Sequence, residues 1–260
     1  MRSLVWSQPG PQQKDNLCGP FWAARVLLEA GFIEWSGEPI DEDLIASRAG
    51  TTLPPADGEP ALPPGAISRT NYRFEMPTAP PEESGTSATG LMRAIESASG
   101  GALRCVPVRG QWTAERIEGL VSQATQLGAR LIANIRTGNL WLSRPHVAVL
   151  IDELAGRPVE NPPHEWDVGH FIELVMLVRG ARSSLVVVHD SYPVLGVDGR
   201  HLQPPRVLAD ALLRRDGREG GVLAIVAREQ ADAVVALVTA LGLDIGTWNN
   251  GSRSADHGDR

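Results

Sequence analysis

The sequence predicts an α+β fold, with helices gathered in the first part of the chain and antiparallel strands in the second. Three observations support this prediction. The patterned segments before residue 100 all have helical spacing, most of the later apolar runs are short enough to be strands, and two of these runs are separated by a short polar turn. A length of 260 residues is enough for one large domain with a substantial core.

The expected helices begin at capping residues and end at glycines or polar turns. Trp22, Val26 and Leu27 repeat at helical spacing, and Gly31 is placed to end that helix. Strong helix formers fill the positions between them. Helices are expected over residues 18–30, 41–50, 87–98, 113–127, 204–213 and 230–241.

The expected strands are apolar runs of four to eight residues. Two of them stand close together, and the polar residues 179–182 between them suit the four-residue loop of an antiparallel hairpin. A further apolar stretch covers residues 146–151, and residues 152–167 are rich in turn formers. Strands are expected over residues 103–108, 131–135, 171–178, 185–188 and 222–226.

Two segments lack the patterning of regular structure. Eight prolines lie between residues 54 and 81, so most of the span 51–85 is expected to be irregular. A long loop of this kind can cover an active site or be a solvated insertion. We therefore expect one domain over residues 1–248 with a Pro-rich insertion at about 51–85, followed by a disordered polar tail over 249–260.

The overall composition is that of a soluble globular protein. Hydrophobic residues make up 42% and charged residues 21%, and the net charge of −7 argues against binding to nucleic acid. No segment has the length and apolar character of a membrane span or a signal peptide. Two cysteines allow at most one disulfide, so a reducing, cytoplasmic compartment is expected.

Cys18 has the sequence context of a nucleophile. It opens the first expected helix, where unpaired backbone N–H groups and the helix dipole stabilise a thiolate. Gln12, six residues upstream, could supply a side-chain amide to an oxyanion, although Gln13 competes for this role. The alternative is that Cys18 is an ordinary buried thiol, as we expect for Cys105 within a strand.

His170 and Asp190 are the predicted partners of this thiol. His170 begins the first strand of the expected hairpin and Asp190 follows the second, so the two residues should be neighbours at one rim of the sheet. A carboxylate there can orient the imidazole and stabilise its charged form. His146 is the main rival because it also precedes an apolar run; His189 should point to the opposite face, and His201 is expected in a loop.

These residues, in this order, resemble the papain-like cysteine peptidase superfamily. The motifs are Gln12 with Cys18-Gly19-Pro20, then Gly169-His170-Phe171, then Asp190 before Tyr192-Pro193. The nearest branch is that of the bacteriocin double-glycine leader peptidases and their stand-alone relatives. The resemblance implies a papain-like fold and a site made of Gln12, Cys18, His170 and Asp190. One departure is Leu17, which stands where that branch typically has Asp immediately before the nucleophile.

The resemblance and the residues together predict a cysteine peptidase or amide acyl-transferase that acts on a peptide through a thioester and needs no cofactor. Water, an amine or a side-chain amide substrate would make it a peptidase, a transpeptidase or cyclase, or a deamidase. Maturation of a ribosomally made peptide is the context that the resemblance suggests. One alternative is an inactive papain-like binding module, and another is an interaction protein that uses the Pro-rich segment. A metal site from His164, Asp167 and His170 matches no strong pattern.

Overall fold

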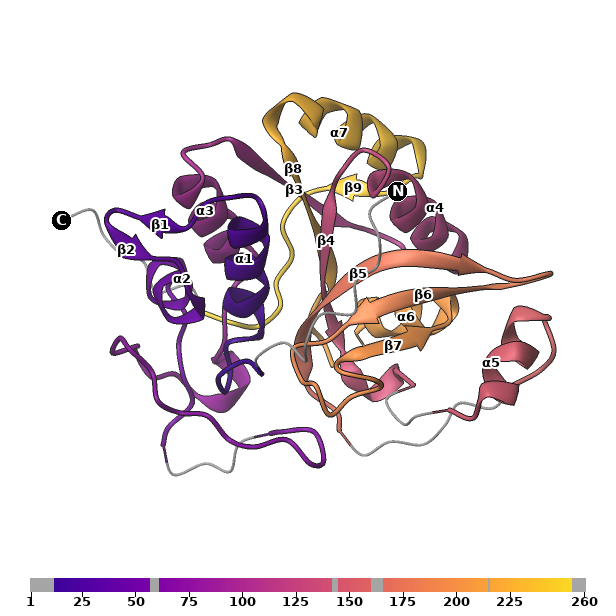
Figure 1. Cartoon of the computed structure of the whole chain (residues 1–260), viewed down its shortest axis with the longest axis horizontal. Helices are drawn as coiled ribbons and strands as arrows, with labels where there is room; N and C mark the ends of the chain where they lie inside the picture. The colour runs from indigo at the N-terminus through magenta and orange to yellow at the C-terminus, as the bar shows by residue number, and fades with distance from the viewer. Residues whose placement is uncertain (1–11, 57–60, 142–144, 160–165, 215, 254–260) are drawn as a thin grey trace.

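A computed structural model of the chain describes residues 12–56, 61–141, 145–159, 166–214 and 216–253. Its centre is an antiparallel sheet of seven strands in the order β7-β6-β5-β4-β8-β3-β9 (Figure 1). The strands of this sheet are β3 (Leu103–Arg109), β4 (Arg130–Arg136), β5 (Gly169–Arg179), β6 (Ser184–His189), β7 (Arg200–Gln203), β8 (Gly221–Ala227) and β9 (Asp244–Ile245). The α+β prediction is therefore confirmed.

Helices cover both faces of this sheet, and each face has its own apolar cluster. On one face lie the N-terminal helices α1 (Cys18–Glu29), α2 (Glu42–Ala49) and α3 (Ala88–Ala98), drawn in indigo and purple in Figure 1. On the other lie α4 (Ala114–Ala124), α6 (Pro205–Leu213) and α7 (Ala231–Ala240). Consecutive residues of β4 alternate between the clusters, since Ile132 packs with α1–α3 whereas Leu131 and Ala133 pack with α4, α6 and α7.

Local sequence explains why several helices start where they do. The Asp41 carboxylate accepts the N–H of Leu44 at the start of α2, and the Ser87 and Thr113 hydroxyls cap α3 and α4 in the same way. Gly50 ends α2 in the left-handed conformation. All six predicted helices are present, although α4 ends at Ala124, three residues before the predicted end.

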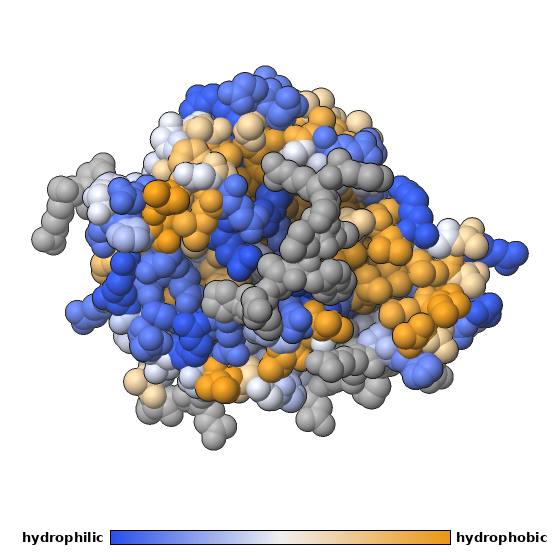
Figure 2. Space-filling model, in the orientation of Figure 1, coloured by the Kyte–Doolittle hydropathy of each residue, from blue (hydrophilic) through white to orange (hydrophobic). Residues whose placement is uncertain are grey.

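The chain contains several elements that were not predicted. The apolar stretch after His146 forms helix α5 (Val147–Leu154), which lies to one side of the sheet in Figure 1. A small hairpin pairs β1 (Glu34–Trp35) with β2 (Glu38–Pro39), and the edge strands β7 and β9 are very short. Figure 2 shows apolar side chains over the region of α5 and the β5–β6 hairpin, where Val147, Ile151 and Met176 are exposed.

The Pro-rich segment is irregular over most of its described length, as predicted. It contains one short 3₁₀ helix, Pro81–Glu83, and two isolated bridges, which join Thr52 to Gly85 and Leu53 to Thr78. The tail prediction is wrong for its first five residues. The Asn250 side chain is buried and donates to the carbonyl of Thr86, and Ser252 donates to Ser84, so residues 249–253 are held against the end of this segment. The rest of the predicted tail lies outside the described residues.

Candidate active site

Cys18 is the first residue of α1, and the start of this helix is open to an anion. Leu17 is the N-cap residue, so no side chain caps the helix, and the first turn holds no acidic residue. The first N–H groups of a helix have no partner within it, and the dipole places partial positive charge there. A thiolate at Cys18 therefore lies in a favourable field that nothing in the first turn of α1 neutralises.

The segment before Cys18 is held by two different parts of the chain. The Asp15 carboxylate accepts the backbone N–H of Arg69 at 3.0 Å and the hydroxyl of Ser68. Lys14 forms an ion pair with Asp43 of α2, and its own N–H donates to Glu42. These contacts fix the approach to α1 from the Pro-rich segment on one side and from α2 on the other.

His170 and Asp190 are in contact at the rim of the sheet, where the hairpin prediction placed them. His170 Nε2 lies 3.1 Å from Asp190 Oδ1, and both side chains are almost completely buried. β5 and β6 pair with His189 opposite Glu173, which brings the residue after β6 beside the start of β5. Asp190 Oδ1 also accepts the N–H of Tyr192 at 2.9 Å, so the carboxylate is held from two directions.

The Cys18 side chain is near enough to His170 to act on its imidazole. Because Nε2 faces Asp190, Nδ1 is the nitrogen left for the sulfur. Burial alone would lower the pKa of His170, but the carboxylate of Asp190, with a smaller contribution from Cys18, raises it well above its ordinary value. Burial would raise the pKa of Asp190, but His170 and His201 hold it below its ordinary value. The charged forms of the imidazole and the carboxylate therefore stabilise each other.

Two aromatic rings surround the imidazole and separate it from water. The ring of Trp166 meets that of His170 edge-on at 5.0 Å between centroids, and the ring of Tyr192 lies 5.8 Å away. Burial raises the pKa of the Tyr192 hydroxyl, and the nearby Cys18 adds to this effect. A low-dielectric surrounding strengthens the attraction between His170 and its charged neighbours.

Neither of the two glutamines predicted as a donor to the oxyanion points its side-chain amide at the Cys18 sulfur. The Gln12 side chain donates to the carbonyl of Ile67 in the Pro-rich segment. Gln13 is buried, with its amide nitrogen 3.1 Å from the Tyr192 hydroxyl and its amide oxygen accepting from Ser191. Spacing along the chain could not predict the orientation of the Gln12 side chain, which depends on the adjacent Pro-rich segment.

The rival residues have other surroundings. His146 is exposed, and its Nδ1 accepts the N–H of Ala148 at the start of α5. His189 packs on Trp22, with Nδ1 3.6 Å from Glu173. Cys105 is buried in β3, and burial raises the pKa of its thiol. His164 lies outside the described residues, and the described residues contain no cluster arranged for a metal ion.

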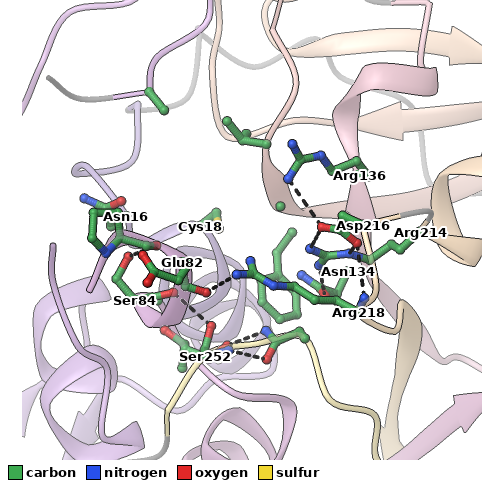
Figure 3. A pocket seen from close by; sticks show the side chains of 18 of the residues that line it. Asn16, Cys18, Glu82, Ser84, Asn134, Arg136, Arg214, Asp216, Arg218 and Ser252 are labelled. Atoms are coloured by element: carbon green, nitrogen blue, oxygen red, sulfur yellow. Dashed lines mark hydrogen bonds and ion pairs between the residues drawn. The ribbon is translucent and has the colours of Figure 1, made fainter. Parts of the chain in front are cut away.

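A cavity of about 390 Å³ opens beside Cys18. Figure 3 shows Cys18 at its edge, with Asn16, Glu82 and Ser84 on one side and a group of arginines on the other. Arg214 donates to Asn134 and pairs with Asp216 at 2.7 Å, and Arg136 also pairs with Asp216. The walls of the cavity therefore carry both signs of charge.

Sequence reasoning missed one residue of this cluster. His201 was expected in a loop, but it lies on β7 with Nε2 3.8 Å from Asp190 Oδ2. β7 has only four residues, and no spacing rule connects it with the hairpin. The only available signal was the presence of a histidine within a dozen residues of Asp190.

None of the described helices has the length and apolar character needed to cross a bilayer.

Comparison with known proteins identifies the family of this chain but assigns no activity to it. No curated protein and no solved structure is significantly similar to this chain. A family model described as a family of unknown function, DUF6885, matches residues 7–249. The chain therefore belongs to DUF6885.

Proposed function

We propose that this protein is a cysteine-nucleophile peptidase or amide acyl-transferase of papain-like type. The observation that carries the proposal is the buried His170–Asp190 pair, with Cys18 close enough to raise the pKa of His170, at the edge of a cavity and at an uncapped helix start. A nucleophile, a base and a group that orients the base are the minimum set for this chemistry. The order of these residues along the chain also matches the resemblance to papain-like peptidases.

The proposed reaction begins with a proton transfer. Nδ1 of His170 accepts the proton of Cys18, which gives a thiolate and an imidazolium, and Asp190 stabilises the imidazolium through Nε2. The thiolate attacks the amide carbonyl of the substrate and forms a C–S bond. His170 then protonates the leaving nitrogen as the C–N bond breaks, which leaves a thioester. Water resolves the thioester to an acid, or an amine resolves it to a new amide.

The tetrahedral intermediate needs donors for its oxyanion. The backbone N–H of Cys18 is available for this purpose because it belongs to the first turn of α1. Gln12 can act as a second donor only after its side chain leaves the carbonyl of Ile67. We expect substrate binding to displace that contact, since Ile67 is exposed. Maturation of a ribosomally made peptide remains the biological context that the resemblance favours.

The proposal is tested by covalent labelling with a panel of electrophilic peptides, followed by mass spectrometry. The wild type is compared with Cys18→Ala, Cys105→Ala and His170→Gln. Labelling at neutral pH should occur on Cys18 in the wild type and in Cys105→Ala, be absent in Cys18→Ala and be slow in His170→Gln. The labelled side chains would also reveal the sequence preference. A native protein that leaves Cys18 unlabelled at neutral pH would refute the proposal and favour a binding module.

A further inference from the structure

The two oxygens of the Asp190 carboxylate have very different surroundings. Oδ1 faces both His170 Nε2 and the N–H of Tyr192. Oδ2 is buried, and in the described part of the chain no donor lies within hydrogen-bonding distance of it. Nε2 of His201 lies 3.8 Å away, is itself buried and has no partner among the described residues. Two buried polar atoms without partners therefore face each other.

The neighbours of His201 determine which of its nitrogens carries the proton. The Gln203 side-chain oxygen accepts the N–H of Trp141 at 2.8 Å, which fixes the orientation of the amide. Its Nε2 then donates to the Trp141 carbonyl at 2.9 Å and faces Nδ1 of His201 at 2.8 Å. An amide nitrogen can only donate, so Nδ1 accepts and the proton of the neutral ring is on Nε2. That N–H faces Asp190.

We propose that His201 is a positioning residue, which donates from Nε2 to Asp190 Oδ2 and holds the carboxylate so that Oδ1 meets His170. A charged oxygen that is buried without a donor is strongly destabilising, and a movement of about 1 Å brings this pair to the length of an ordinary charge-assisted bond. The inference rests on the proposed function, because a fixed carboxylate matters most when His170 must become an imidazolium.

The three groups together carry a simple charge pattern. Asp190 is an anion, His170 becomes a cation when Cys18 is a thiolate, and Nε2 is the donor nitrogen of His201 because Gln203 occupies its Nδ1. Cys18 from α1 also acts on His170, and the Tyr192 hydroxyl is influenced by the charges of Cys18, Asp15 and Asp190. Without His201, Oδ2 of Asp190 would lose the donor that we propose for it, and the carboxylate would stabilise the imidazolium less.

The test follows the rate of Cys18 alkylation by iodoacetamide against pH, in a Cys105→Ala background. His201→Leu removes the donor at similar volume, whereas His201→Gln keeps an N–H near the position of Nε2. His189→Leu is the matched control, since His189 is also a sheet histidine near a buried carboxylate. In His201→Leu we expect the onset of alkylation to move up by about one pH unit. At pH values below the midpoint, the alkylation rate should then be about tenfold lower than in the background protein. His201→Gln should restore most of the rate, and His189→Leu should follow the background protein.

The outcomes separate this inference from the proposed function. Alkylation that starts at the pH of an ordinary thiol in the background protein would overturn both. An early onset that is unchanged in His201→Leu, even if the variant melts at lower temperature, would overturn only the role of His201. Nitrogen-15 NMR of the histidine rings gives a readout that needs no variant to fold. The His201 proton should be on Nε2, and a proton on Nδ1 would contradict the inference directly.

Discussion

Glu42 connects the stability of the fold to pH at a point close to the nucleophile. Its side chain is only 13% exposed, and its carboxylate accepts the N–H of Lys14 at 2.9 Å. Burial raises the pKa of Glu42 from 4.5 to about 7, although the Lys14 N–H and the charge of Arg69 act in the opposite direction. Replacement by Gln keeps an oxygen acceptor for Lys14 and removes the titration.

The sign of the effect follows from the proton balance. Between pH 4.5 and about 7 the folded protein keeps a proton on Glu42 that the unfolded chain releases, so the contribution of Glu42 to stability falls as the pH rises. A rise of the pKa from 4.5 to about 7 corresponds to ~3.4 kcal/mol at 1.36 kcal/mol per pH unit. We therefore expect Glu42→Gln to gain about 3 kcal/mol over the wild type between pH 4.5 and about pH 8.

Urea unfolding followed by tryptophan fluorescence at these two pH values measures the effect. Glu229→Gln is the control, because this side chain is exposed on the short helix Arg228–Gln230. The stability difference between the control and the wild type should not change with pH. Two outcomes would show that burial does not dominate the pKa of Glu42. The stability difference between Glu42→Gln and the wild type could be as independent of pH as that of the control. It could also shift in favour of the wild type as the pH rises.

Three further predictions concern packing and the candidate site. Gly90→Ala should lower the free energy of unfolding by at least about 2 kcal/mol, since a Cβ there would come within 2.2 Å of the Ala49 carbonyl oxygen; a urea midpoint equal to that of the wild type would contradict this. Cys105 should resist a thiol reagent in the native protein and react only on unfolding, because it is buried; native reaction as fast as that of Cys18 would oppose this. Asp190→Asn should slow Cys18 alkylation at about pH 6 by about tenfold or more, because it removes the charge that raises the pKa of His170. An unchanged rate would show that the Asp190 carboxylate does not influence the reactivity of the Cys18 thiol.

The β5–β6 hairpin was predictable because its information is local. Two apolar runs with a short polar turn between them allow one simple pairing, and that pairing determines which residues meet at the open end. The contact between His170 and Asp190 follows from it, since one residue starts β5 and the other follows β6. The contact survives a small error in the turn, which covers residues 180–183 rather than 179–182.

Other features depend on tertiary contacts that no local pattern records. A short apolar run can be either a strand or a helix, and the run after His146 forms α5. β7 exists because its four residues pair with β6, which also brings His201 to Asp190. The amide of Gln12 faces Ile67, 55 residues away, because the Pro-rich segment lies against the approach to α1. Each of these outcomes depends on which distant segment is adjacent.

The distance between the nucleophile and its base is determined by the packing of α1 on β5. Trp22, four residues after Cys18, donates its indole N–H to the carbonyl of Phe171 at 3.1 Å, next to His170. Gly19 lies so close to α3 and to this strand that a Cβ would meet Leu91 of α3 at 2.8 Å and Phe171 of β5 at 3.2 Å. A helix held by a hydrogen bond on one turn and by close contact on the preceding turn cannot slide along β5. The residues on each side of Cys18 and His170 therefore set the geometry on which the proposed proton transfer depends.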